Sequence, residues 1–273
     1  PLAISSPVVS LWANPQQLKD SPRLAELSAL LGVDAAELKD KLALYGNKHF
    51  MYLARHQAPD FARQILQEAF PGVRGERAYR RYYPAGEVTA QVLGLTNVDG
   101  EGIAGIELAF EQWLQGIPGK KRFIKDLQGE AVRDFGLITK PRPGKALSLS
   151  LDLRLQYVQH RELQRAMKET GAVAGSAITV DAWTGEILAV SNYPVFNPNN
   201  REAFDYSAAR NRALTDVYEP GSTIKTLTLI AALESGQFTI DSLVNTAPGR
   251  IRVGGKVLHD PRNYGEIRVS KII

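Results

Sequence analysis

The feature that most constrains this 273-residue chain is a polar stretch near its middle, LITKPRPGKA. It holds Pro141, Pro143 and Gly144, and because such a stretch neither continues a helix nor suits the interior of a sheet, it is predicted to be a linker. We therefore predict two domains, residues 1–144 and residues 145–273. Because 44% of the residues are hydrophobic, a chain of this length can bury a core in each domain.

The first domain is predicted to begin as a strand and then to become helical. Apolar and polar residues alternate up to Trp12, and Asn14 with the proline after it is expected to end that strand. Residues 20–72 contain three stretches with apolar residues at helical spacing, which predict a small helical subdomain. Residues 80–119 are rich in glycine, which indicates tight turns and close backbone approach, with a helix over about 107–114.

The second domain is predicted to be of the α+β class. ALSLSLD alternates as a strand, and its Asp152 is placed to cap a helix that runs to about Glu169. SAITVDAWTGEILAVSN contains two alternating runs, and Gly185 suits the bulged turn of a β-hairpin between them. An apolar helix follows within YEPGSTIKTLTLIAALESG. Strand, helix, hairpin and helix in this order indicate helices packed on an antiparallel sheet.

Composition excludes several classes of function. The chain has no cysteine, which excludes disulfides, thiol nucleophiles and cysteine-bound zinc. Lys and Arg number 33 against 29 Asp and Glu, and the small excess is spread too evenly for a nucleic-acid footprint. No run is long and apolar enough for a transmembrane helix. We expect no metal and no cofactor, because the four histidines lack carboxylates at ligand spacing and no phosphate-binding glycine loop is present.

The apolar helix carries the pair that points to chemistry, Ser222 and Lys225. Residues three apart share a helix face, so the hydroxyl and the amine can come within reach of each other. The surrounding side chains are apolar, and removal from water disfavours a charged ammonium group. A neutral amine can accept the serine proton, as nucleophilic catalysis by a hydroxyl requires.

The residues before the pair add a second argument. Glu219, Pro220 and Gly221 cannot form a helix interior, so Ser222 should lie in the first turn, where unpaired N–H groups could stabilise an oxyanion. A lone Ser-x-x-Lys is also expected by chance in a chain this rich in both residues. Ser222 as a helix cap and Lys225 as a surface residue therefore form the plain alternative.

Two longer stretches decide between these interpretations. NRALTDVYEPGSTIK and GSAITVDAWTGEILAVSNYPVFNPNN closely resemble the first active-site motif, and the hairpin before it, of class B penicillin-binding proteins. The stretch from RRYYPAGEV to EQWLQGIPG is similar to a conserved box of that family's non-catalytic pedestal domain. Its RYYP and TNVDGEGIAGIE segments are most similar to the division-specific branch.

The resemblance implies a peptidoglycan D,D-transpeptidase of the division septum. Ser222 would attack the penultimate D-Ala of a stem pentapeptide, Lys225 would be the base, and β-lactam antibiotics would acylate the same serine. Glu219 would line the cleft, unless it only favours the helix N-terminus. Arg210 and Arg212 would brace the loop. The family's partners are a membrane-embedded glycan polymerase and other division proteins, and its location is the periplasm, anchored in the bacterial inner membrane by one preceding helix.

The sequence also departs from the family pattern. The second and third family motifs, Ser-x-Asn and Lys-Ser/Thr-Gly, have no counterpart, so we expect residues 1–273 alone to be catalytically incomplete. Two alternatives stay open: a serine β-lactamase, and a β-lactam sensor or division-complex scaffold without turnover. A persistent penicillin adduct would argue against the first, and turnover of a D-Ala-D-Ala substrate would argue against the second.

Overall fold

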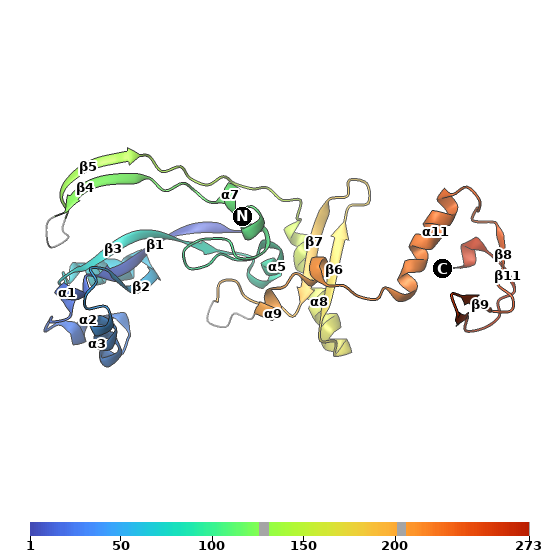
Figure 1. Ribbon diagram of the computed structural model, residues 1–273, viewed down its shortest axis with the longest axis horizontal. Coiled ribbons are helices and arrows are strands. Elements are labelled where there is room, and N and C mark those ends of the chain that lie inside the picture. The colour runs from blue at the N-terminus through green and yellow to red at the C-terminus, as the bar shows by residue number, and fades with distance from the viewer. Residues whose placement is uncertain (126–130, 201–205, 273) are drawn as a thin grey trace. The chain divides into compact units, whose positions relative to one another are not determined.

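The computed structural model describes residues 1–125, 131–200 and 206–272 (Figure 1). It forms two compact units, Pro1–Asp216 and Val217–Ile273. The strands of the first unit are β1 (Ile4–Ala13), β2 (Met51–Gln57), β3 (Val73–Tyr82), β4 (Lys120–Lys125), β5 (Ala131–Thr139), β6 (Gly175–Val180) and β7 (Ile187–Tyr193). Its helices are α1 (Pro15–Leu18), α2 (Leu24–Leu31), α3 (Ala35–Leu44), α4 (Pro59–Gln67), the 3₁₀ turn η1 (Gly86–Val88), α5 (Ala90–Leu93), α6 (Gly105–Ala109), α7 (Glu111–Leu114), α8 (Leu153–Thr170), α9 (Tyr206–Ala209) and α10 (Arg212–Thr215).

The predicted first strand is the centre of an antiparallel sheet with the order β2-β1-β3. It ends at Ala13, and the Asn14 side chain accepts a hydrogen bond from Gln16 N at the start of α1. The expectation of an all-helical segment over 20–72 is wrong in one respect, because β2 runs through it. Strand β2 pairs with β1, from Ala13 opposite Met51 to Val9 opposite Gln57, and so supplies partners to main-chain groups of β1 that a helix over 51–57 would leave without them.

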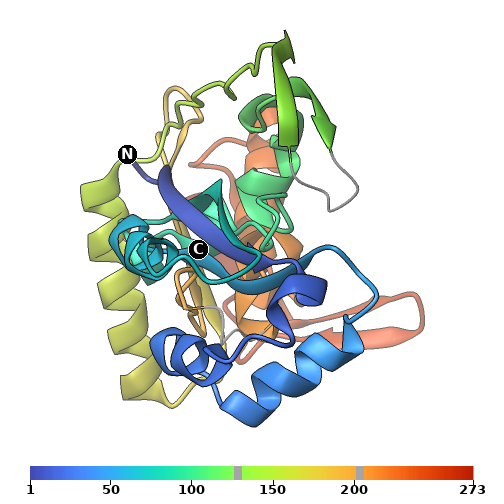
Figure 2. The same cartoon turned by 90° about the vertical axis from the view of Figure 1, so that its left-hand side faces the viewer.

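Two helix ends in this region have the local signals that their sequences carry, whereas α2 begins only at Leu24 and has no side-chain cap. Gly32 ends α2 in the left-handed conformation with φ 68°, and Asp34 caps α3 by accepting bonds from two main-chain N–H groups. The helices α1 to α3 gather beside the sheet (Figures 1 and 2). Together with α4 and the sheet they bury one core, which consists of Leu11, Ala13, Leu18, Leu27, Leu38, Leu42, Met51, Ala62, Ile65 and Phe70.

The glycine-rich box contains the close backbone contacts that its composition predicts. Gly94 has φ 73°, and a Cβ on it would lie 1.9 Å from the carbonyl oxygen of Ala104, so no other residue fits there. The helix expected over 107–114 is present as two short helices, α6 and α7, which meet at Phe110.

The polar stretch around Pro141 is not a free linker. Arg142 forms a β-bridge with Ile117, and Lys145 N donates to Trp113 O at 3.0 Å. A Cβ on Gly144 would lie 1.8 Å from the carbonyl oxygen of Leu114, so glycine is required for this packing. The stretch therefore lies against α7, after the antiparallel pair β4 and β5. The domain boundary at 144 stays a prediction.

The helix and the hairpin of the α+β prediction are present, and α8 lies beside β6 and β7 (Figure 1). The strand expected at ALSLSLD is wrong, because this described stretch forms no ladder and meets the start of β7 only through Ser150 Oγ to Ile187 O and Asp152 N to Leu188 O. Asp152 Oδ1 accepts from Arg154 N and Leu155 N. The hydrogen bond from the Arg154 guanidinium, together with these two main-chain bonds, lowers the pKa of Asp152. Gly171 ends the helix with φ 66°. In the hairpin turn, Gly185 has φ 76°, as the bulged turn requires.

The second unit contains the apolar helix and two small antiparallel pairs. Its elements are η2 (Gly221–Thr223), α11 (Ile224–Glu234), β8 (Leu243–Asn245), β9 (Arg250–Val253), β10 (Lys256–His259), β11 (Glu266–Arg268) and η3 (Val269–Lys271). Strand β9 pairs with β10, and β8 pairs with β11.

Candidate active site

Ser222 lies in the turn that leads into the apolar helix, close to where the sequence predicts it. It belongs to the 3₁₀ turn η2, and α11 begins two residues later at Ile224. Gly221 has φ 56°, a conformation that favours glycine, and it leaves the backbone beside the hydroxyl without a side chain. This local geometry places the serine at the N-terminal end of a helix, where main-chain N–H groups lack partners.

Lys225 lies in the first turn of α11 and is exposed, as is Ser222. No residue of α11 is buried in the described part of the chain, and Ile224, Leu227 and Ile230 are 48%, 61% and 46% exposed. The apolar side chains predicted around Lys225 are therefore present, but the described residues do not bury its amine. Among those residues, no hydrogen bond joins the Ser222 hydroxyl to the Lys225 amine, and their catalytic roles stay a prediction.

The segment before the serine is braced as the sequence suggests. Asp216 accepts from Arg210 at 2.5 Å and from Arg212 at 3.1 Å, and Arg210 Nε also donates to the Thr215 hydroxyl. Both arginines therefore have a structural partner. Glu219 is exposed between this segment and η2, and its role stays a prediction.

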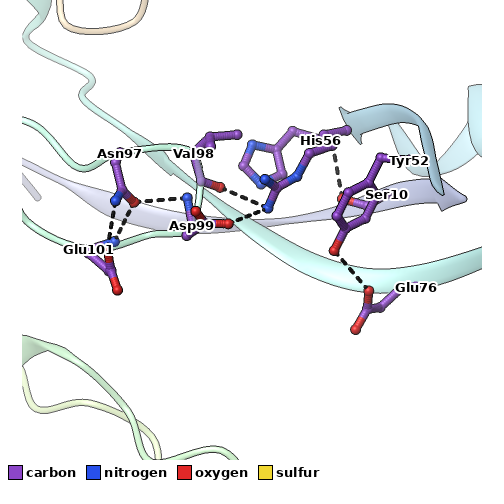
Figure 3. Close-up of polar contacts among 9 residues, drawn as sticks. Ser10, Tyr52, His56, Glu76, Asn97, Val98, Asp99 and Glu101 are labelled. Atoms are coloured by element: carbon purple, nitrogen blue, oxygen red, sulfur yellow. Dashed lines mark hydrogen bonds and ion pairs between the residues drawn. The ribbon is translucent and has the colours of Figure 1, made fainter. Parts of the chain in front are cut away.

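The TNVDGEG loop of the glycine-rich box is fixed to the sheet (Figure 3). Within the loop, Asn97 Oδ1 accepts from Asp99 N and Glu101 N, and Asn97 Nδ2 donates to the Glu101 carboxylate. Arg55 on β2 donates to the Asp99 carboxylate at 2.7 Å and stacks over the Tyr52 ring at 4.5 Å. This loop therefore connects the box to the three-stranded sheet.

Two side-chain amides, one buried and one partly buried, join the box to the residues around α8 and β7. Gln156 on α8 is fully buried: its Nε2 donates to Val88 O and Val190 O, each at 2.7 Å, and its Oε1 accepts from Val190 N at 2.8 Å. Asn199 exchanges two bonds with the main chain of Tyr83, at 3.0 and 2.9 Å. The sequence analysis predicted a role for neither residue. For Gln156 the only signal was an uncharged polar residue among the apolar positions of α8, and Asn199 had no signal.

A cavity of about 370 Å³ lies where η1 meets α8. Glu87, Arg161 and Asn197 are among the residues that line it, and His160 is nearly buried in its wall. His160 Nε2 contacts Gln164 Nε2 at 2.8 Å, and burial lowers the pKa of the imidazole.

Burial also raises the pKa of Tyr83, which lies outside this cavity and whose hydroxyl accepts from Thr96 N.

Within residues 1–125, 131–200 and 206–272, no group of three metal-ligating side chains comes together, and no helix is both long and apolar enough to cross a bilayer.

Two domain-family models match most of the chain. Residues 1–149 match the penicillin-binding protein dimerisation domain, and residues 175–270 match the penicillin-binding protein transpeptidase domain. This chain belongs to the class B penicillin-binding proteins. Both Ser222 and Lys225 lie within the range of the transpeptidase model, while the pedestal box lies within the dimerisation model.

Relatives of this penicillin-binding protein carry names that agree with the family. The chain is 40% identical to a probable peptidoglycan D,D-transpeptidase, PbpC, of Pseudomonas aeruginosa over 95% of its length, and 39% identical to peptidoglycan D,D-transpeptidase FtsI of Escherichia coli K12 over 100%. It is 36% identical to the probable D,D-transpeptidase PenA of Neisseria gonorrhoeae. The chain spans about half the length of these relatives, 46% to 47%.

Solved structures support the fold. The chain superposes on penicillin-binding protein 2X of Streptococcus thermophilus with a TM-score of 0.67 and 24% identity, over 95% of this chain and 42% of that one. A peptidoglycan synthetase from Bifidobacterium adolescentis gives a TM-score of 0.61 and 23% identity, over 97% and 53%. These likenesses show an α+β fold with a dimerisation domain followed by part of a transpeptidase domain.

Proposed function

We propose that the protein containing this chain is a peptidoglycan D,D-transpeptidase of septal cell-wall synthesis, with Ser222 as nucleophile and Lys225 as base. The observation that carries the proposal is the position of this pair, three residues apart at the start of α11 and inside the match to the transpeptidase model. The names of the relatives support the substrate class and, through FtsI, the septal role.

The proposed acylation follows from the chemistry of the two side chains. Ser222 Oγ bonds to the penultimate D-Ala carbonyl carbon while its proton passes to a neutral Lys225 amine. The C–N bond to the terminal D-Ala then breaks, and that leaving amine takes the proton. Main-chain N–H groups at the start of the helix stabilise the oxyanion, and an amine of a neighbouring stem peptide later releases the acyl group.

The neutral amine is the demanding step, because the described residues leave Lys225 in water. Desolvation of an ammonium group favours its neutral form, so the proposal requires that the working protein or its bound substrate covers the first turn of α11. The exposed apolar side chains Ile224 and Leu227 give such a cover a surface to pack on.

Location and partners belong to the same proposal. The protein is proposed to lie in the inner membrane with its described region in the periplasm, as the resemblance to the division-specific branch implies. The glycan polymerase and the division proteins are proposed partners of the pedestal, and β-lactams are proposed ligands of Ser222. Glu219 is proposed to line the cleft for the stem peptide, so Glu219→Gln should weaken the binding of substrate more than it slows the acylation step.

The test is intact-mass spectrometry of the full-length protein with benzylpenicillin, followed by peptide mapping. We expect one adduct on Ser222, none on Ser222→Ala, and acylation slowed by about 10²- to 10⁴-fold in Lys225→Ala, the range for loss of a general base. An adduct on another serine would refute the site. Rapid hydrolysis of the adduct would indicate a β-lactamase, and a stable adduct without turnover of a D-Ala-D-Ala peptide would indicate a sensor.

A further inference from the structure

One pedestal side chain, Gln91 on α5, holds two points of the chain that lie between β7 and the serine. Gln91 is 5% exposed, and its Nε2 donates to Pro194 O at 2.9 Å and to Ala208 O at 3.1 Å. Both protons of the amide are therefore used on main-chain oxygens of the other half of the molecule. The second of these oxygens belongs to α9, in the approach to Ser222.

The surroundings of this amide are apolar. A second buried cluster combines residues of the box with residues that follow β7, so water has little access to replace the bonds of Gln91. The members of this cluster are Tyr83, Ala90, Leu93, Leu95, Phe196 and Ala208.

From Ala208 onward the chain is fixed at several further points. Asn192 on β7 accepts from Ala213 N at 2.7 Å and donates to the Asn211 side chain at 3.0 Å. With the two arginine pairs to Asp216, these bonds make residues 208–216 one compact segment. The segment is therefore hydrogen-bonded to β7 through Asn192 and to the pedestal through Gln91.

We propose that Gln91 is a positioning residue for acylation at Ser222, an inference that rests on the proposed function of that serine. The chain reaches Ser222 only six residues after Asp216, so the freedom of the 208–216 segment limits how steadily the nucleophile is presented. Loss of the bond to Ala208 O loosens that segment. A misplacement of about 1 Å at a reacting group can cost on the order of 100-fold in rate.

The test uses the full-length protein and three variants. Gln91→Met keeps the length of the side chain but removes both donors, Gln91→His keeps one N–H donor, and Gln112→Met is a matched change at an exposed position on α7. Two quantities are measured: the acylation rate constant with a fluorescent penicillin, per folded molecule, and hydrogen–deuterium exchange of residues 208–216 without any β-lactam.

We expect Gln91→Met to acylate about 10- to 100-fold more slowly and residues 208–216 to exchange faster, with partial recovery of both in Gln91→His. Gln112→Met should match the wild type in both. A wild-type rate in Gln91→Met would overturn the inference. So would a slower rate with unchanged exchange of 208–216, because the loss would not come from this segment. If the wild type itself is not acylated at Ser222, the proposed function fails. In that case, unchanged exchange of residues 208–216 in Gln91→Met would separately overturn the claim that Gln91 holds this segment.

Discussion

Gln156→Leu tests how strongly a single amide joins the pedestal box to α8 and β7. Leucine has nearly the volume of glutamine, so the change removes hydrogen bonds without opening a cavity. Three main-chain groups lose their partner: Val190 O and Val190 N, which are buried, and Val88 O, which is partly buried. At roughly 1 to 2 kcal/mol for each of the two buried groups left unpaired, the free energy of unfolding should fall by about 2 to 4 kcal/mol.

That loss is a large share of the stability of an ordinary domain, about 5 to 15 kcal/mol. The assay is urea denaturation of the full-length protein in detergent, followed by circular dichroism and by hydrogen–deuterium exchange at 88 and 190. Gln64→Leu, on the exposed face of α4, is the matched control and should change stability by no more than about 0.5 kcal/mol. A loss below about 1 kcal/mol in Gln156→Leu would show that the amide is replaceable and that apolar contacts alone hold the junction.

Three further changes test other parts of the first unit. Glu107 is almost buried and accepts from Arg81 Nε at 2.7 Å, so Glu107→Gln should lower the free energy of unfolding by roughly 1 to 3 kcal/mol, as measured by thermal denaturation. Glu37→Gln, in the exposed pair with Lys41, should lower it by less than about 1 kcal/mol. Burial lowers the pKa of His160, so as pH falls the unfolded chain takes up the proton before the folded chain does, and the stability of the fold should decrease below the ordinary histidine pKa. His160→Gln should flatten this part of the plot of melting temperature against pH. An unchanged plot would refute the role of His160. Gly144→Ala places a Cβ against a main-chain oxygen, so we expect a lower melting temperature and faster exchange of residues 142–146, and wild-type values would contradict the packing.

Much of the local structure could be predicted from the sequence because the signals lie within a few residues. The cap at Asp152, the left-handed glycine at Gly171 and the hairpin turn at Gly185 each depend on short-range sterics and hydrogen bonds. The motif around Ser222 is equally local, so its place at the start of the apolar helix could be inferred without a fold.

Strand β2 could not be placed in this way. It exists because its backbone pairs with β1, about 40 residues away in the sequence, and pairing at that distance leaves no periodic signal strong enough to overrule the helices on either side. For the same reason the stretch around Gly144 reads as a linker, although in the fold it packs against α7.

Motifs and short spacings in the sequence are enough to establish the family and the α+β class, and they predict Ser222 and Lys225 as the catalytic pair. How the halves of the first unit are joined follows only from the packed fold. Gln91, Gln156 and Asn199 look like ordinary polar residues in the sequence, and they matter because folding places their amides, the first two of them buried, beside main-chain groups more than 30 residues distant. A buried amide must find partners, and which partners it finds depends on the packing of the whole chain.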